Sequence, residues 1–153
     1  MHITDLVSED RVIPALSEQT KDGVLRELVD PLAAEHPGID TDQLLAMLWE
    51  RERLGSTGIA EGVAIPHAKL PGLPKVIGVV GRHRQGIDFA SLDGTPTKLF
   101  FLLVTPAEAA AQHLKALAQV SRLVKDAVFR ERLMTATDRH ELYLQITSHD
   151  GQS

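Results

Sequence analysis

The segment Leu99-Phe100-Phe101-Leu102-Leu103-Val104 constrains the fold of this chain more than any other stretch. Its six consecutive residues are all apolar, so a β-strand built from them presents hydrophobic side chains on both faces. Such a strand is typical of a sheet that is covered by helices above and below. A membrane-spanning helix would need about 20 apolar residues. The segment therefore predicts a central strand in a three-layer α/β domain.

A helix is predicted before this strand, between residues 18 and 35, where apolar residues recur at helical spacing. Ser17 stands in the position of an N-cap. Pro31 should kink this helix or end it early, because proline lacks the N–H that a helix interior uses. His36-Pro37-Gly38 ends the helix at the latest.

A second helix is expected from a cap at Thr41 or Asp42 to about Arg53, and Gly55 closes it. Short runs of β-forming residues, separated by glycine and proline, come next. We predict strands over residues 62–66, 76–82 and 98–105, helices from residue 108 onward, at 127–134 and at 138–147, and a frayed tail after Ser148. This order indicates an α/β fold in which helices flank a mixed sheet on both faces.

Composition limits the possible functions. With 153 residues and 43% hydrophobic content, the chain is expected to form a single domain over residues 1–153. It has no cysteine, which excludes disulfides, thiolate metal ligands and a thiol nucleophile, and we expect a cytoplasmic protein without a membrane-inserted segment. A formal net charge of −5 and only six aromatic residues argue against binding of nucleic acid.

The segment from Gly55 to Lys69 carries the densest signal for chemistry. Three glycines fall within its first eight residues, and Ser56 and Thr57 precede Gly58, so backbone N–H groups and hydroxyls there are candidates for binding a phosphate. The segment has neither the ending of a P-loop nor the glycine spacing of a dinucleotide fold. Taken alone, the pattern is equally that of a glycine turn between a helix and a strand.

His67 follows an apolar strand and a proline, which places its imidazole at the rim of the predicted sheet. Neutral imidazole is a good nucleophile near neutral pH, although a structural histidine is a common alternative. His113 is predicted at the start of the helix after the central strand, where it can approach His67. A metal site is not expected, because no third ligand lies at a recognisable spacing. The Gly-x-Ser-x-Gly motif of many serine hydrolases is absent as well.

These motifs resemble the active-site signature of the fructose–mannitol class of enzyme IIA domains of the bacterial phosphotransferase system. The resemblance covers nearly the whole chain and rests on Gly55-Ser56-Thr57-Gly58-Ile59, Gly62-x-Ala64-Ile65-Pro66-His67-x-Lys69, Phe89, Asp93-Gly94-x-Pro96, the 99–104 strand, Pro106 and His113-Leu114. It implies a mannitol-type enzyme IIA fold and phosphorylation of His67. It also implies that His113 is the second active-site histidine and that Arg51, sixteen residues before His67, belongs to the same site.

The implied chemistry needs no cofactor, because transfer of a phosphoryl group depends on positioning and on cationic or N–H donors. Arg51, His113 and the Ser56–Gly58 backbone are the candidates to supply them. Apart from the resemblance, Arg51 and Lys69 read as ordinary surface residues.

The implied donor is a histidine phosphocarrier protein of the HPr or NPr type. The output is either phosphorylation-dependent regulation of partner proteins, as in nitrogen-regulatory IIA proteins, or transfer to the IIB component of a fructose or mannitol transporter.

Overall fold

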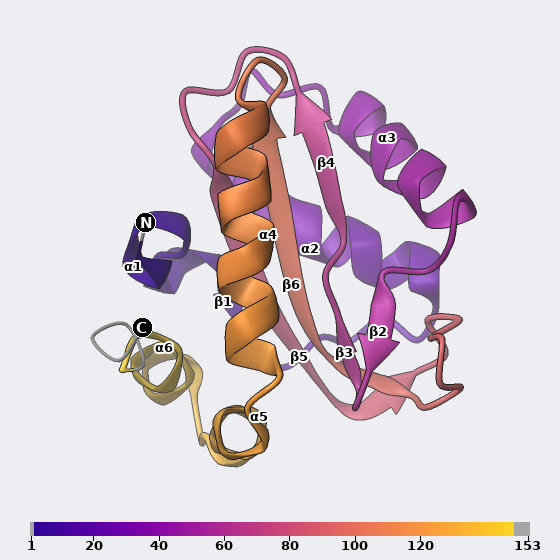
Figure 1. The fold of residues 1–153 in the computed structure, drawn as a ribbon, viewed down its shortest axis with the longest axis vertical. Helices are drawn as coiled ribbons and strands as arrows, with labels where there is room; N and C mark the ends of the chain where they lie inside the picture. The colour runs from indigo at the N-terminus through magenta and orange to yellow at the C-terminus, as the bar shows by residue number, and fades with distance from the viewer. Residues whose placement is uncertain (1, 149–153) are drawn as a thin grey trace.

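A computed structural model describes residues 2–148 of the chain. Its elements follow in the order α1 (Ile3–Leu6), a 3-10 turn (Glu9–Arg11), β1 (Val12–Ile13), α2 (Lys21–Glu35), α3 (Thr41–Arg53), β2 (Gly58–Ala60), β3 (Val63–Ala64), β4 (His67–Leu70), β5 (Ile77–Ile87), β6 (Thr97–Pro106), α4 (Ala110–Val124), α5 (Ala127–Thr135) and α6 (Arg139–Thr147). Figure 1 shows β4 between α3 and α4.

The sheet is mixed, and β6 is its central strand. β5 pairs with one edge of β6 in antiparallel fashion, and β1 continues the sheet beyond β5 in parallel. β3 and then β4 pair in parallel along the other edge of β6, while β2 pairs with β3 in antiparallel fashion. In this register His67 faces Leu103, and β4 ends beside Pro106.

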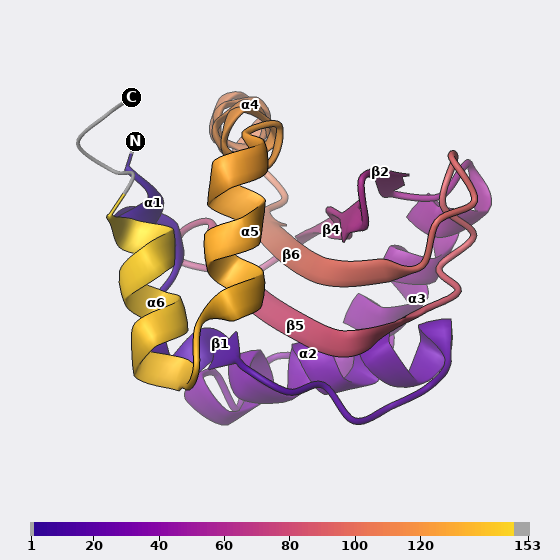
Figure 2. The same ribbon diagram turned by 90° about the horizontal axis from the view of Figure 1, so that it is seen from below.

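Two hydrophobic cores lie on opposite faces of the sheet, and the central strand contributes to both. Phe100, Leu102 and Val104 pack into the core beneath α2 and α3. Leu99, Phe101 and Leu103 pack into the core shared with α1, α4, α5 and α6. Figure 2 shows the resulting three layers from below. The predicted α/β architecture, with helices on both faces of a mixed sheet, is confirmed.

The first long helix differs from the prediction at its start and at its proline. Its N-cap is Thr20, whose Oγ1 accepts a hydrogen bond from the Gly23 N–H at 3.0 Å. Ser17 instead donates its N–H to the carboxylate of Glu27. Pro31 lies inside α2 and does not end it, because the buried face of the helix packs into the core on both sides of the proline. Packing thus offsets the hydrogen bond that proline removes.

Other boundaries shift by a few residues. The cap of α3 is Asp40, one residue earlier than predicted, and it accepts a hydrogen bond from the Gln43 N–H at 3.0 Å. The strand predicted over 62–66 is reduced to Val63–Ala64, whereas the strand predicted over 76–82 continues to Ile87. The helices predicted from 108 onward, at 127–134 and at 138–147 are present as α4, α5 and α6. The tail after Ser148 lies outside the described residues.

Candidate active site

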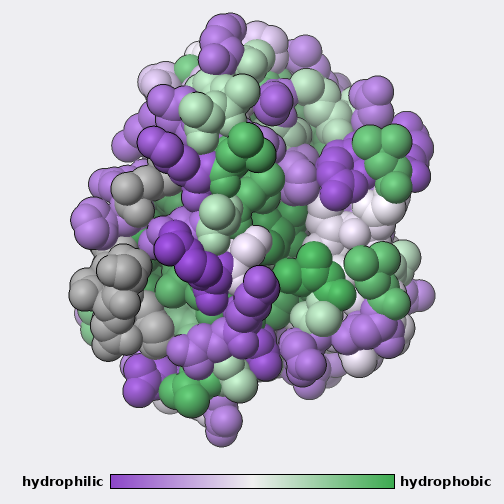
Figure 3. Space-filling model, in the orientation of Figure 1, coloured by the Kyte–Doolittle hydropathy of each residue, from purple (hydrophilic) through white to green (hydrophobic). Residues whose placement is uncertain are grey.

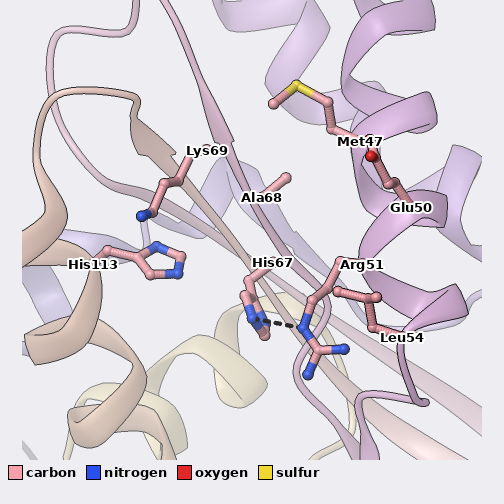
Figure 4. Close-up of a pocket in the computed structure, with 8 residues that line it drawn as sticks. All are labelled: Met47, Glu50, Arg51, Leu54, His67, Ala68, Lys69 and His113. Atoms are coloured by element: carbon pink, nitrogen blue, oxygen red, sulfur yellow. Dashed lines mark hydrogen bonds between the residues drawn. The ribbon is translucent and has the colours of Figure 1, made fainter.

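An open pocket of about 360 Å³ lies where α3, β4 and α4 meet. Its lining residues are Met47, Glu50, Arg51, Leu54, His67, Ala68, Lys69 and His113. Figure 4 shows Arg51 extending from α3 toward His67, with His113 on the opposite side of that ring. The fold therefore brings together three residues that lie 16 and 46 positions apart along the chain.

His67 is held in one tautomer by its own backbone neighbourhood. Its Nδ1 lies 2.8 Å from the carbonyl oxygen of Ile65, and a carbonyl only accepts hydrogen bonds, so Nδ1 carries the proton. Nε2 therefore has a free lone pair in the neutral ring, and it accepts a hydrogen bond from Arg51 Nε–H at 3.3 Å. His67 is the first residue of β4, a strand that pairs only with the central strand β6, and it lies in register with Leu103. After Pro66 the chain resumes pairing with β6, which fixes the backbone at His67.

Arg51 lies in the last turn of α3, and the guanidinium has two fixed partners. Nε–H donates to His67 Nε2, and an Nη1 hydrogen donates to the carbonyl oxygen of Gly55 at 2.8 Å. A fixed guanidinium beside the ring nitrogen is well suited to an incoming phosphoryl group, because it presents several N–H donors and a permanent positive charge.

His113 lies in the first turn and a half of α4, with its ring centroid 5.4 Å from that of His67. The residue is buried, and its Nδ1 lies 2.7 Å from the hydroxyl oxygen of Thr105. A hydroxyl that donates to Nδ1 leaves the proton of the neutral ring on Nε2. We expect this tautomer, because an Nε2–H is a donor and a phosphoryl group presents only acceptors.

Replacement of Thr105 by valine tests this assignment. Valine keeps the shape of threonine but removes the hydroxyl, so the buried Nδ1 of His113 loses its donor and the Nε2–H tautomer loses its advantage. We expect the ¹⁵N chemical shifts of the His113 ring to move toward the Nδ1–H tautomer, and Thr105→Ser to restore the wild-type shifts. Unchanged shifts in Thr105→Val would show that this hydroxyl does not select the tautomer.

The surroundings of both site histidines favour the neutral ring. Burial is the main cause that lowers the pKa of His67 below its ordinary value of 6.5, and the positive charge of Arg51 lowers it further. The hydrogen bond to Ile65 and the charge of Glu52 act in the opposite direction. Burial also lowers the pKa of His113, followed by the effects of His67 and Lys69. The lone pair on His67 Nε2 is therefore available at neutral pH.

These directions predict a pH dependence. When the pH falls below about 6.5, histidines of the unfolded chain take up protons before folded His67 and His113 do, so the free energy of unfolding should decrease. NMR titration should place the midpoints of both residues below 6.5. The exposed His140 is an internal reference, since the Glu9 carboxylate raises its pKa, and its midpoint should lie above 6.5. A His67 midpoint at or above that of His140 would contradict the account.

The three residues predicted to bind phosphate do not line this pocket. The Ser56 hydroxyl donates to the Phe89 carbonyl at 2.7 Å and accepts from the Gly58 N–H at 2.9 Å. The Thr57 N–H and hydroxyl both donate to the carboxylate of Glu52. These groups are thus engaged by protein partners. The segment contacts Arg51 through the carbonyl oxygen of the preceding Gly55.

Two other pocket residues, Met47 and Leu54, had no signal for a site in the sequence. Met47 lies in α3 and Leu54 is the C-cap of that helix, so their place at the pocket is apparent only once α3 packs against β4. Lys69 is exposed beside His113. Within residues 2–148, no group of three or more His, Asp or Glu side chains is placed to hold a metal ion. No helix in the described part of the chain is long and apolar enough to cross a membrane.

Comparison with known proteins agrees with the geometry. Residues 5–149 match the family model described as "Phosphoenolpyruvate-dependent sugar phosphotransferase system, EIIA 2". The chain therefore belongs to this family of phosphotransferase-system enzyme IIA domains. It is 43% identical to a nitrogen regulatory protein of Bradyrhizobium diazoefficiens over 143 residues, which cover 94% of this chain and 93% of that protein.

Solved structures agree as well. The crystal structure of the nitrogen regulatory protein IIA-Ntr from Neisseria meningitidis superimposes with a TM-score of 0.87 at 29% identity, covering 95% of this chain and 99% of that one. The crystal structure of IIA mannitol from Escherichia coli superimposes with a TM-score of 0.75 at 16% identity, covering 92% of this chain and 98% of the other. The expected mannitol-type fold is thereby confirmed.

Proposed function

We propose that His67 accepts a phosphoryl group on Nε2 and holds it as phosphohistidine until an acceptor protein arrives. The observation that carries the proposal is the lone pair of His67 Nε2, which is fixed by the Ile65 carbonyl and faces Arg51 in an open pocket. The family supports this proposal, because phosphoryl transfer is its common activity. We propose that this function belongs to a single cytoplasmic domain.

The transfer is an exchange of P–N bonds. Nε2 of His67 attacks the phosphorus of a phosphohistidine on a phosphocarrier protein of the HPr or NPr type, and the donor's P–N bond breaks as the new one forms. The electron pair of the broken bond returns to the donor ring. The His67 ring gains positive charge during the attack, and the hydrogen bond from Nδ1 to Ile65 stabilises that charge. No cofactor takes part in the proposed step.

Arg51 and His113 stabilise the group in transit. The transition state spreads negative charge over three oxygens, and preorganised N–H donors favour it over the ground state. Arg51 has only to move its Nε–H from the lone pair of Nε2 to a phosphoryl oxygen. His113 supplies a second donor from the other side of the pocket. In this proposal Ser56, Thr57 and Gly58 hold the loop next to Arg51 through their own hydrogen bonds, and direct phosphate binding by them is secondary.

We further propose that the output is regulatory: phosphorylation decides which partner proteins bind. The similarity to nitrogen regulatory proteins supports this choice. Figure 3 shows apolar surface between α4 and α3, on the face that carries the pocket. Leu54 lines the pocket and is 84% exposed, and Leu114, directly after His113, is 68% exposed. Exposed leucines beside a reactive centre suit docking of a protein. The alternative is transfer to the IIB component of a sugar transporter. Membership in the EIIA 2 family of the sugar phosphotransferase system supports this alternative.

The regulatory proposal predicts that binding of partners depends on the phosphorylation state. A phosphoryl group adds close to two negative charges at neutral pH to a chain of formal net charge −5. Burying that charge at an interface costs several kcal/mol, and every 1.4 kcal/mol changes affinity about tenfold. Pull-downs with phosphorylated and unphosphorylated protein should therefore recover different partners, while the circular dichroism spectrum and the melting temperature stay nearly unchanged.

His67→Ala is the control for that experiment, since it locks the unphosphorylated state. It should recover the same proteins as unphosphorylated wild type. Recovery of the same partners in the same amounts by both states of the wild type would remove the support for a regulatory output and favour the sugar-transport alternative.

A further inference from the structure

Glu52 is a buried carboxylate that lies directly behind the site. It follows Arg51 in the last turn of α3, and its side chain is only 1% exposed. Its oxygens accept hydrogen bonds from the Thr57 N–H at 3.0 Å and from the Thr57 hydroxyl. A carboxylate at this depth is costly unless it is paired and hydrogen-bonded, so its partners are a built arrangement and not incidental contacts.

The partner charge comes from the first residue of α2. Lys21 Nζ lies 2.8 Å from Glu52 Oε1 and 3.3 Å from the carbonyl oxygen of Phe89. The ammonium also lies over the Phe89 ring, 4.4 Å from its centroid. The Phe89 carbonyl accepts the Ser56 hydroxyl as well. The pair therefore joins α2, α3, the segment around residue 89 and the loop at residues 55–57.

This loop is in direct contact with the guanidinium of Arg51. The Gly55 carbonyl accepts Arg51 Nη1 at 2.8 Å, and the Gly55 N–H donates to the backbone carbonyl of Glu52 at 3.1 Å. Gly55 has a φ of +148°, a conformation that glycine adopts readily and side-chain-bearing residues rarely do. Thr57, two residues further on, is anchored to Glu52. A continuous path of contacts thus leads from Lys21 and Glu52 through the loop to Arg51 and then to His67 Nε2.

We propose that Glu52, paired with Lys21, is a positioning residue for phosphoryl transfer: it fixes the 55–57 loop through Thr57, and the loop aims the Arg51 guanidinium at His67. This inference rests on the function proposed above. It explains why the Thr57 hydroxyl faces the interior and not the pocket. A guanidinium that is held before the phosphoryl group arrives needs no reorganisation during transfer.

The experiment removes the anchor and leaves Arg51 in place. Thr57→Val deletes one hydrogen bond to Glu52 with little change in shape, and Thr57→Ser retains the hydroxyl. We expect Thr57→Val to slow phosphorylation of His67 about tenfold at saturating phosphocarrier, because misaimed donors lose much of their effect. The concentration of carrier at half saturation should stay unchanged, and Thr57→Ser should restore the wild-type rate. Glu131→Gln changes an exposed residue of α5 outside this network, so it is a control for substitution as such and should keep the wild-type rate.

The Arg51→Ala background separates positioning from a general structural role. If the anchor acts through Arg51, adding Thr57→Val to Arg51→Ala should slow transfer no further. A wild-type rate in Thr57→Val would overturn the proposal. So would a double variant in which Thr57→Val slows Arg51→Ala as much as it slows the wild type. Should Thr57→Val fail to fold, the pair Lys21→Met/Glu52→Met, which removes both charges and the acceptor for Thr57, takes its place with the same expectations. If wild-type protein is not phosphorylated at all, the proposed function fails instead.

Discussion

Replacing His67 by alanine is expected to abolish phosphorylation completely. The ring provides the nitrogen that forms the P–N bond, and His67 combines an Nδ1–H held by a carbonyl with an arginine donor at the lone pair of Nε2. The neighbouring His113 has its Nδ1 engaged by Thr105, and we expect its Nε2 to carry a proton. The variant should therefore take up no phosphate from a phosphocarrier even after long incubation, as measured by intact mass.

Two controls sharpen this test. The phosphate on wild-type protein should be lost in acid and retained in base, as expected of a P–N bond. His140→Ala removes an exposed histidine on α6, away from the pocket, and should be phosphorylated as wild type is. Full labelling of His67→Ala would show that the phosphate lies on another residue.

Removal of Arg51 or His113 is expected to slow transfer strongly without unfolding the protein. Each residue supplies a donor aimed at the place where charge develops, and loss of one such donor costs about 3 kcal/mol of transition-state stabilisation, or about a hundredfold in rate. Arg51→Ala and His113→Ala should each show this loss in single-turnover transfer from a phosphorylated carrier. Arg51→Lys should recover only part of the rate, because an ammonium lacks the planar array of donors.

Folding of these variants is checked separately. Arg51 is partly exposed, and its removal leaves the cores on both faces of the sheet intact. His113 is buried, so its alanine variant should be less stable yet cooperative in thermal unfolding. Wild-type transfer rates in both folded variants would show that neither Arg51 nor His113 takes part in the transfer.

The long, strongly patterned elements of this chain could be predicted from its sequence, and the short ones could not. The apolar run at 99–104 predicts a buried central strand because its side chains fill both cores. β4 escaped prediction because Pro66 precedes it and His67 and Lys69 interrupt its apolar pattern. It exists as a strand because β6 supplies its hydrogen bonds from more than 30 residues further along the chain. Pairing between strands so far apart along the chain produces no pattern in the local sequence.

The residues of the site also divide into those that the sequence identifies and those that it does not. Histidine and arginine at the 16-residue spacing carry the family's signature, so His67, Arg51 and His113 could be named before the structure was known. Glu52 could not, because it stands between two arginines in a run typical of a solvated helix face. One residue advances a helix by about 100°, which sends Arg51 toward the pocket and Glu52 into the interior. The contact of Thr105 with His113 likewise depends on how α4 packs over the end of β6.

Phosphorylation of the wild-type chain tests the central claim most directly. The protein is incubated with phosphoenolpyruvate, the general enzyme of the phosphotransferase system and a histidine phosphocarrier, and its intact mass is then measured. We predict a gain of one phosphoryl group, located by fragmentation on His67, only when all three components are present. An unchanged mass with a carrier that is itself phosphorylated, or a phosphate located on any other residue, would contradict the account.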